Sequence, residues 1–262
     1  MILFLHLSSH YHTLPSLTQL SLCYIRISLK ILINLLKIMF LRRNVMLKAI
    51  FIDHMGTIIF EKSKYSLQLM NECIENCDLD DVEELNTLFI QKHDELLGQY
   101  NGDNYKKEYD IVLETMQYLQ EKVNLKGDIH HYADMLVYHW THVNAYEDTY
   151  DFFDQCPLPV YILTNNDTYY VEESIKALKL KPKGIISSEM THYYKPSKEM
   201  FKKALAMTKL KPEEVVYIGN NYKKDILAAK AIGMRAFLIG KTNCDDSQVT
   251  TIESLLDVFE YL

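Results

Sequence analysis

The sequence contains little arginine and little cysteine. Of its 262 residues, arginine occurs only at positions 26, 42, 43 and 235, so nearly all basic residues are lysines. The five cysteines are odd in number, and their spacing matches no zinc site. This pattern excludes a disulfide framework and indicates free thiols in a reducing compartment, so we expect a cytoplasmic protein.

The sequence also lacks an uncharged apolar run of about 20 residues, the length that spans a bilayer. Its most apolar stretch, residues 22–41, is interrupted by Arg26, Lys30 and Lys37, which share one face of an expected amphipathic helix. We expect contact with a membrane only if this basic helix acts at a membrane surface. We interpret residues 1–45 as an extension upstream of the true start, and we expect the remainder to fold without them.

Charge is divided unevenly along the chain. Residues 1–45 contain five basic residues and no acidic one, and the whole chain has a net charge of −7. Residues 46–262 therefore carry −12. Nucleic-acid binding depends on Lys and Arg that neutralise phosphates, so this acidic part argues against nucleic acid and favours a small-molecule partner.

Short apolar runs alternate with helical patterns in the second half of the chain. Strands are expected at 49–52, 160–164, 184–187, 215–219 and 235–239. Helices are expected between them at about 168–180, 197–210 and 223–232. Strand–helix alternation predicts an α/β fold of three layers, with a doubly wound, Rossmann-type parallel sheet.

Residues 63–150 show helical periodicity only. One apolar stripe is formed by Tyr109, Val112, Met116, Leu119 and Val123, and similar stripes precede and follow it. We therefore expect an α-helical cap, residues 63–150, inserted into a core domain formed by residues 46–62 and 151–262.

Four polar motifs follow the ends of the expected strands. They are Asp53-His54-Met55-Gly56-Thr57, then Thr164, then Lys195-Pro196, and finally Gly219-Asn220-Asn221-Tyr222-Lys223-Lys224-Asp225. Their order and intervals resemble the four motifs of the haloacid dehalogenase superfamily of hydrolases, whose first motif is normally Asp-x-Asp-Gly-Thr. The carboxyl ends of parallel strands are where open α/β sheets bind ligands, so we expect these residues to converge.

The resemblance implies phosphatase-type chemistry on a small phosphorylated metabolite. Asp53 would attack phosphorus and form an aspartyl phosphate, which splits one difficult hydrolysis into two steps. Thr164, Asn165 and Lys195 would hold the phosphoryl oxygens, with Lys195 also stabilising charge in the transition state.

The resemblance also implies a Mg²⁺ cofactor. Its ligands would be Asp53, the backbone carbonyl of Met55, Asn220 and Asp225. Two of these residues depart from the family pattern. Met55 replaces the acid/base aspartate, and a thioether cannot transfer protons. Asn220 replaces an aspartate of the fourth motif, which removes one negative charge from the metal site.

Three other functions remain open. A haloacid dehalogenase also lacks the second aspartate, but it needs a cap arginine, and residues 44–234 contain none. A phosphonoacetaldehyde hydrolase needs a cap lysine, and several lysines are available. A non-catalytic protein would keep the phosphate site without turnover. The chain is expected to be a monomer or a homodimer.

Overall fold

The structure is a computed structural model that describes residues 46–240 and 246–262. The amphipathic helix expected within residues 1–45 lies outside these ranges. The described residues contain a six-stranded sheet in which every strand pairing is parallel. The strands are β1 (Ala49–Ile52), β2 (Val160–Thr164), β3 (Gly184–Ser187), β4 (Val215–Gly219), β5 (Arg235–Ile239) and β6 (Thr250–Ile252).

The strand order is β3-β2-β1-β4-β5-β6, which is the order of a doubly wound sheet. The predicted fold class is therefore confirmed, and five of the strands have the predicted bounds. The sixth, β6, was not predicted, because it is three residues long and two of them are exposed threonines. So short a run has no pattern that distinguishes it from a loop.

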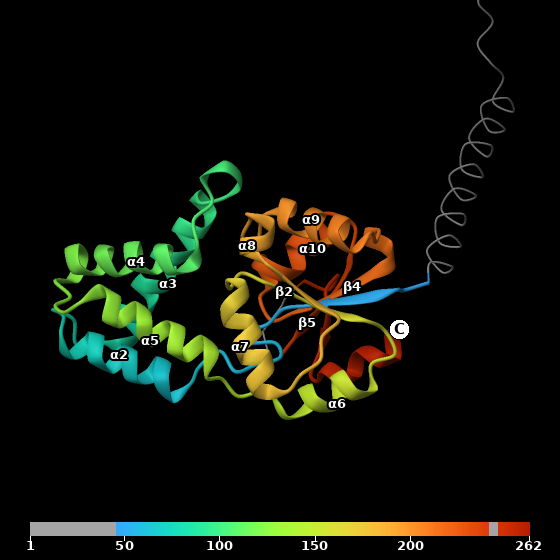
Figure 1. The fold of residues 1–262 in the computed structure, drawn as a ribbon, viewed down its shortest axis with the longest axis horizontal. Coiled ribbons are helices and arrows are strands. Elements are labelled where there is room, and N and C mark those ends of the chain that lie inside the picture. Colours follow the sequence, from blue (N-terminus) through green and yellow to red (C-terminus); the bar gives the residue numbers. More distant parts are fainter. Residues whose placement is uncertain (1–45, 241–245) are drawn as a thin grey trace, which may run out of the picture. The chain divides into compact units, whose positions relative to one another are not determined.

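Helices cover both faces of the sheet (Figure 1). The elements of this core are α6 (Glu147–Gln155), α7 (Thr168–Leu178), α8 (Ser188–Thr191), α9 (Lys198–Thr208), the 3₁₀ helices η2 (Pro212–Glu214) and η4 (Leu255–Tyr261), the π-helical turn η3 (Tyr222–Leu227) and α10 (Ala228–Lys230). The helix expected at 223–232 is thus a π-helical turn followed by one short α-helical segment.

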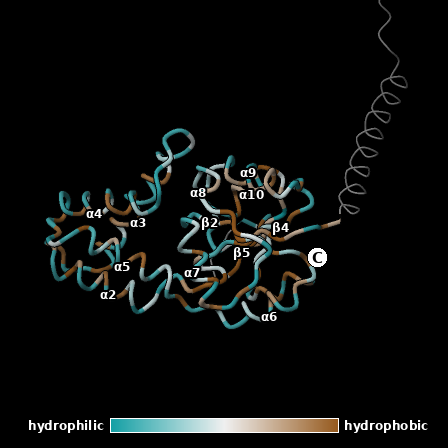
Figure 2. Tube along the Cα trace, viewed as in Figure 1, coloured by the Kyte–Doolittle hydropathy of each residue, from teal (hydrophilic) through white to brown (hydrophobic). Residues whose placement is uncertain are grey.

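The side chains of the strands alternate between the two layers, as extended strands require. Ile50 and Ile52 belong to the apolar cluster that includes residues of α6, α7 and η4. Phe51, between them, belongs to the cluster that includes residues of α9 and α10. Both sides of β1 are fully buried, which explains why its sequence is continuously apolar. Figure 2 shows hydrophobic residues concentrated along the central strands.

Between β1 and β2 the chain forms a helical insertion, defined here as residues 64–141. It comprises α2 (Lys64–Glu75), α3 (Val82–Gln99), the 3₁₀ turn η1 (Gly102–Asn104), α4 (Glu108–Val123) and α5 (Ile129–Thr141). The stripe predicted on α4 is buried at Val112, Met116, Leu119 and Val123, and it packs in an apolar cluster belonging mainly to the insertion.

Helix α6 packs on the core. Asp148 Oδ2 accepts hydrogen bonds from Ser254 Oγ and from the backbone N–H of Leu255, both at 2.7 Å. Phe152 stacks on Phe259 with ring centroids 5.7 Å apart. The expected boundary at residue 150 therefore falls inside a helix that belongs to the core layer.

Within the described ranges, none of the helices combines the length and the apolar character needed to cross a membrane.

A substitution at Phe237 on β5 tests how much the burial of apolar side chains between the sheet and its helices stabilises the fold. Its side chain is 0% exposed, so Phe237→Ala would leave a cavity and lower the free energy of unfolding by roughly 3–5 kcal/mol. Urea unfolding measures this loss. The control Met207→Ala, at a side chain that is 46% exposed, should change it by less than about 0.5 kcal/mol. A comparable loss in both variants would contradict this packing.

Candidate active site

The candidate site lies where the strand order reverses. Strands β1 and β4 are neighbours although their positions in the sequence are far apart, and Asp53 and Asn220 follow directly after them. Thr164 is the last residue of β2, the other neighbour of β1. A doubly wound sheet opens a crevice at this point, which positions polar side chains from three strands around one space.

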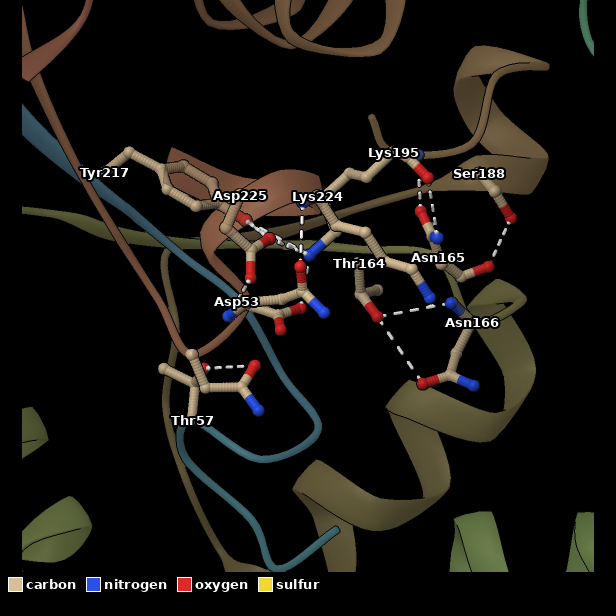
Figure 3. A network of polar contacts seen from close by, with 12 residues as sticks. Asp53, Thr57, Thr164, Asn165, Asn166, Ser188, Lys195, Tyr217, Lys224 and Asp225 are labelled. Atoms are coloured by element: carbon tan, nitrogen blue, oxygen red, sulfur yellow. Dashed lines mark hydrogen bonds and ion pairs between the residues drawn. The ribbon is translucent and has the colours of Figure 1, made fainter. Parts of the chain in front are cut away.

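A buried lysine joins the first, third and fourth motifs (Figure 3). Lys195 Nζ donates to Asp53 Oδ1 at 2.5 Å and to Asp225 Oδ1 at 2.7 Å. The Lys195 side chain is 4% exposed, and that of Asp225 is 1% exposed. Charge-assisted hydrogen bonds of this length are strong in a buried site, so they fix all three side chains relative to one another.

Tyr217 completes this cluster and was not anticipated. Its hydroxyl donates to Asp225 Oδ1 at 2.7 Å and accepts from Lys195 Nζ at 3.1 Å. The only sequence signal was a phenol within the apolar strand β4, and such residues are common in cores. A buried tyrosine hydroxyl needs a partner, and that requirement could have pointed to this role.

The charges of the cluster do not balance, because two carboxylates share one ammonium group. Burial raises the pKa of Asp53 from 3.8 to about 6; Lys195 lowers it, and the charge of Asp225 raises it again. Burial alone would lower the pKa of Lys195, but Asp225 and Asp53 outweigh burial and raise it. Lys195 therefore stays charged, and Asp53 is the carboxyl group whose ionisation becomes less favourable.

Two glycines allow the motif loops to approach closely. Gly56 has a φ of +79°, and a Cβ there would lie 2.1 Å from Asn220 Nδ2. At Gly219 a Cβ would lie 2.6 Å from the Asp225 carboxylate. Any larger residue at either position would displace a side chain of the fourth motif. Asn220 also faces Thr57, whose hydroxyl donates to Asn220 Oδ1 at 3.5 Å.

The residue after Thr164 holds the backbone of the third motif. The Asn165 side chain accepts from the backbone N–H of Lys195 at 2.6 Å and donates to the carbonyl of Lys195 at 3.2 Å. Asn165, expected to bind phosphate, therefore uses both of its polar atoms to hold Lys195 in place. The hydroxyl of Thr164, which is 2% exposed, accepts from the backbone N–H of Asn166 at 3.2 Å.

The helical insertion reaches the site through Glu108 at the start of α4. Glu108 Oε2 accepts from Asn166 Nδ2 at 2.8 Å, and the backbone N–H of Glu108 donates to Asp167 Oδ2 at 3.1 Å. Tyr105 donates to Asp167 Oδ1 at 3.0 Å. None of these four residues was identified from sequence, because helical periodicity does not reveal which polar residue faces the core.

A second link to the insertion runs through the fourth motif. Lys224 Nζ donates to Asp94 Oδ1 on α3 at 2.5 Å. Both side chains are about one-third exposed, so the stabilisation from this pair is small.

The insertion and the strand ends line a cavity of about 410 Å³ that is open to solvent on one side. All seven predicted site residues line it: Asp53, Met55, Thr164, Asn165, Lys195, Asn220 and Asp225. The wall from the insertion adds apolar side chains, including Phe89 and Trp140. The same wall also has polar and charged side chains, including Asn86, His93 and Glu108. A cavity that combines apolar lining with a few convergent polar groups is the usual form of a small-molecule site.

The metal ligands expected from sequence form an oxygen-rich group. Asp53 and Asp225 contribute carboxylates, and Asn220 contributes an amide oxygen; all three line the same cavity. In the described ranges no cluster of three or more His, Cys, Asp or Glu side chains forms a metal site by itself. Any cation here would therefore need the amide or backbone oxygens as well.

Comparison with known proteins identifies the class. The model of the haloacid dehalogenase-like hydrolase family matches residues 52–239, which include all four motifs. The chain belongs to this family of hydrolases.

The curated relatives match only parts of the chain. The glyceraldehyde 3-phosphate phosphatase of Methanocaldococcus jannaschii is 31% identical over 111 residues, 38% of this chain and 49% of that protein. The haloacid dehalogenase-like hydrolase domain-containing protein 3 of Xenopus laevis is 34% identical over 55 residues, 21% of this chain and 22% of that protein. These matches span about half or less of each relative.

Solved structures share the fold over most of the chain. The L-2-haloacid dehalogenase of Xanthobacter autotrophicus superposes with a TM-score of 0.65 at 16% identity, covering 81% of this chain and 97% of that one. The hydrolase YfnB of Bacillus subtilis also gives 0.65 at 16% identity, with coverage of 83% and 99%. Identities this low establish the fold only.

The unbalanced charge of the site predicts a pH dependence of stability. The folded protein holds the proton of Asp53 more tightly than the unfolded chain, because its pKa is raised from 3.8 to about 6. The stability that this bound proton contributes to the folded state is fully present below pH 3.8 and is lost as the pH rises through about 6. Asp167, raised by burial to a pKa of about 6, acts in the same direction.

Asp53→Asn should therefore raise the free energy of unfolding at pH 7 by roughly 1–3 kcal/mol in EDTA and flatten its decline between pH 4 and 6. Urea unfolding at several pH values measures both effects. Asp151→Asn, at an exposed position on α6, is the control and should leave the slope unchanged. A destabilised Asp53→Asn protein would show that the contact with Lys195 outweighs burial.

Proposed function

We propose that this hydrolase removes phosphate from a small phosphorylated metabolite, with Asp53 as the nucleophile. The observation that carries the proposal is the Lys195 cluster, in which one ammonium group orients a buried carboxylate at the end of β1. The partial similarity to glyceraldehyde 3-phosphate phosphatases supports phosphate esters over other substrates.

Each residue of the site has a role in this proposal. Asp53 attacks phosphorus, and the bond to the leaving oxygen breaks, which gives an aspartyl phosphate that water then hydrolyses. Lys195 and the hydroxyl of Thr164 neutralise and bind the phosphoryl oxygens in a buried site, where such contacts are strong. Asn165 and Tyr217 are positioning residues, because they hold the backbone and the ammonium group of Lys195.

The residues present fit a hard divalent cation such as Mg²⁺. The cluster of Asp53, Asp225 and Lys195 has one negative charge in excess, and its donors are oxygens, which Mg²⁺ prefers. Asp53, the carbonyl of Met55, Asn220 and Asp225 would hold the ion, which would offset the negative charge of the phosphate. The Bacillus subtilis hydrolase of the same fold was solved bound to magnesium.

The presence of a methionine at position 55 favours a second candidate function, that of a binding protein that keeps the phosphate site but has no turnover. Met55 lines the cavity beside Asp53, where the family has its acid/base aspartate. The dehalogenase alternative is weaker, since no arginine is found among the residues that line this cavity.

Hydrolysis of acetyl phosphate and p-nitrophenyl phosphate with Mg²⁺ tests the proposal. Both have leaving groups that need little protonation, so the loss of an acid at Met55 should affect them least. We expect turnover by the wild-type protein and loss of it in Asp53→Asn. Asp151→Asn is the matched control.

Met55→Asp separates the two candidates. If the wild-type protein turns over substrate and the Asp53→Asn variant does so as well, Asp53 is not the nucleophile. No turnover in the wild-type protein, but turnover in Met55→Asp, would favour the binding protein.

A further inference from the structure

The proposed hydrolysis lacks a proton donor, since Met55 cannot protonate a leaving oxygen. We propose that Glu108, from the helical insertion, protonates the leaving group in place of the missing motif-one acid. This inference rests on the proposed phosphatase activity and assigns a further catalytic residue to the same site.

Glu108 has the right location for this role. It lines the cavity that is also lined by Asp53 and Thr164, and it belongs to the helical insertion that forms part of that lining. The Glu108 residue is 4% exposed, and Asn166, the neighbour of Asn165, fixes its Oε2 at 2.8 Å. The carboxyl group is thus held in one orientation next to the second motif.

The surroundings of Glu108 favour the protonated form. Burial raises its pKa well above 4.5, and the nearby charge of Asp167 raises it further. No lysine, arginine or histidine of the described ranges forms an ion pair with it, and the nearest favourable charge, Lys224, is paired with Asp94. A buried carboxyl group kept protonated is the usual state of a general acid.

The other ionisable groups of the cavity do not offer this chemistry. Burial lowers the pKa of both His93 and His139 to about 4, so neither carries a proton to donate at neutral pH. Glu61, Lys62 and Glu83 are exposed to solvent, and Asp94 is paired with Lys224. Asp53, Asp225 and Lys195 already share one network of contacts.

Glu108 gives up its proton in the first step of the reaction and regains one in the second. In the first, a bond forms between an Asp53 oxygen and phosphorus, the bond to the leaving oxygen breaks, and the proton of Glu108 moves to that oxygen. The alcohol departs and leaves Glu108 as a carboxylate at the N-terminus of α4, where the helix dipole stabilises an anion. In the second, this carboxylate takes a proton from the water that attacks phosphorus, and the bond between phosphorus and the Asp53 oxygen breaks. Phosphate is released, Asp53 returns to a carboxylate and Glu108 is protonated again.

The dependence of rate on the leaving group tests this role. The full-length chain with Mg²⁺ is assayed on dinitrophenyl, p-nitrophenyl, phenyl and alkyl phosphates. Glu108→Gln keeps the shape and can still accept from Asn166, but it cannot donate the proton. We expect kcat to fall roughly 10²–10⁴-fold on the alkyl ester and to change little on the dinitrophenyl ester, since only a poor leaving group needs an acid.

Glu121→Gln, exposed on the same helix, is the matched control and should behave like the wild-type protein. Glu108→Asp retains an acid and should keep part of the activity on alkyl esters, which separates loss of the proton from loss of folding. The wild-type rate on alkyl esters should also decline as the pH rises through the raised pKa of Glu108, and this decline should disappear in Glu108→Gln. The ionisable groups around Glu108 are Asp167, Tyr170, Tyr194 and Lys224.

An equal loss of activity on all esters in Glu108→Gln would overturn the acid role and indicate a structural one. No loss of activity on any ester would also overturn the acid role. These results leave the proposed function intact as long as Asp53→Asn abolishes turnover. Wild-type protein that hydrolyses none of the esters, or turnover that survives Asp53→Asn, would overturn the proposed function and the role of Glu108 with it.

Discussion

The site depends on one buried ammonium group, Lys195 Nζ, shared by the carboxylates of Asp53 and Asp225. These residues come from three separate motifs: Asp53 follows β1, Lys195 lies between α8 and α9, and Asp225 lies in η3. Removing the lysine would leave two buried carboxylates without a cation, which is strongly destabilising. The fold must therefore hold all three groups, and Tyr217 and Asn165 serve this requirement.

The same cluster links stability to function. Burial is the main reason that the pKa of Asp53 is raised, and the second carboxylate, Asp225, adds to the effect of burial. A divalent cation bound beside Asp53 would favour its ionised form by adding positive charge. Glu108 shows the opposite arrangement, a buried carboxyl group without a paired cation. Active sites that need both a nucleophile and a general acid typically give their two carboxyl groups different pKa values.

Most of the sheet could be predicted because its central strands are buried on both faces and therefore read as continuous apolar runs. The helix expected at 223–232 was wrong in its details for a local reason. The Asn221 side chain accepts from the backbone N–H groups of Lys223 and Lys224, and Asp225 accepts from that of Asn221. Such side-chain bonds compete with regular helical ones.

The site could be predicted only where a motif marked it. Asp53, Thr164, Asn165, Lys195, Asn220 and Asp225 stand at or just after strand ends or in motif loops, and the structure places all of them around one cavity. Glu108 and Asn166 meet across 58 residues, and their contact depends on how the insertion packs on the core. Periodicity identifies the buried face of α4, but a glutamate at its first turn resembles an ordinary helix-start residue.

The central claim is that Asp53 becomes covalently phosphorylated. The most direct measurement is rapid quenching of the protein with acetyl phosphate and Mg²⁺, followed by peptide mapping with mass spectrometry. We expect a phosphoryl group on the peptide that contains Asp53, and none in Asp53→Asn. Turnover without any phosphorylated peptide, or a phosphoryl group on another residue, would contradict it.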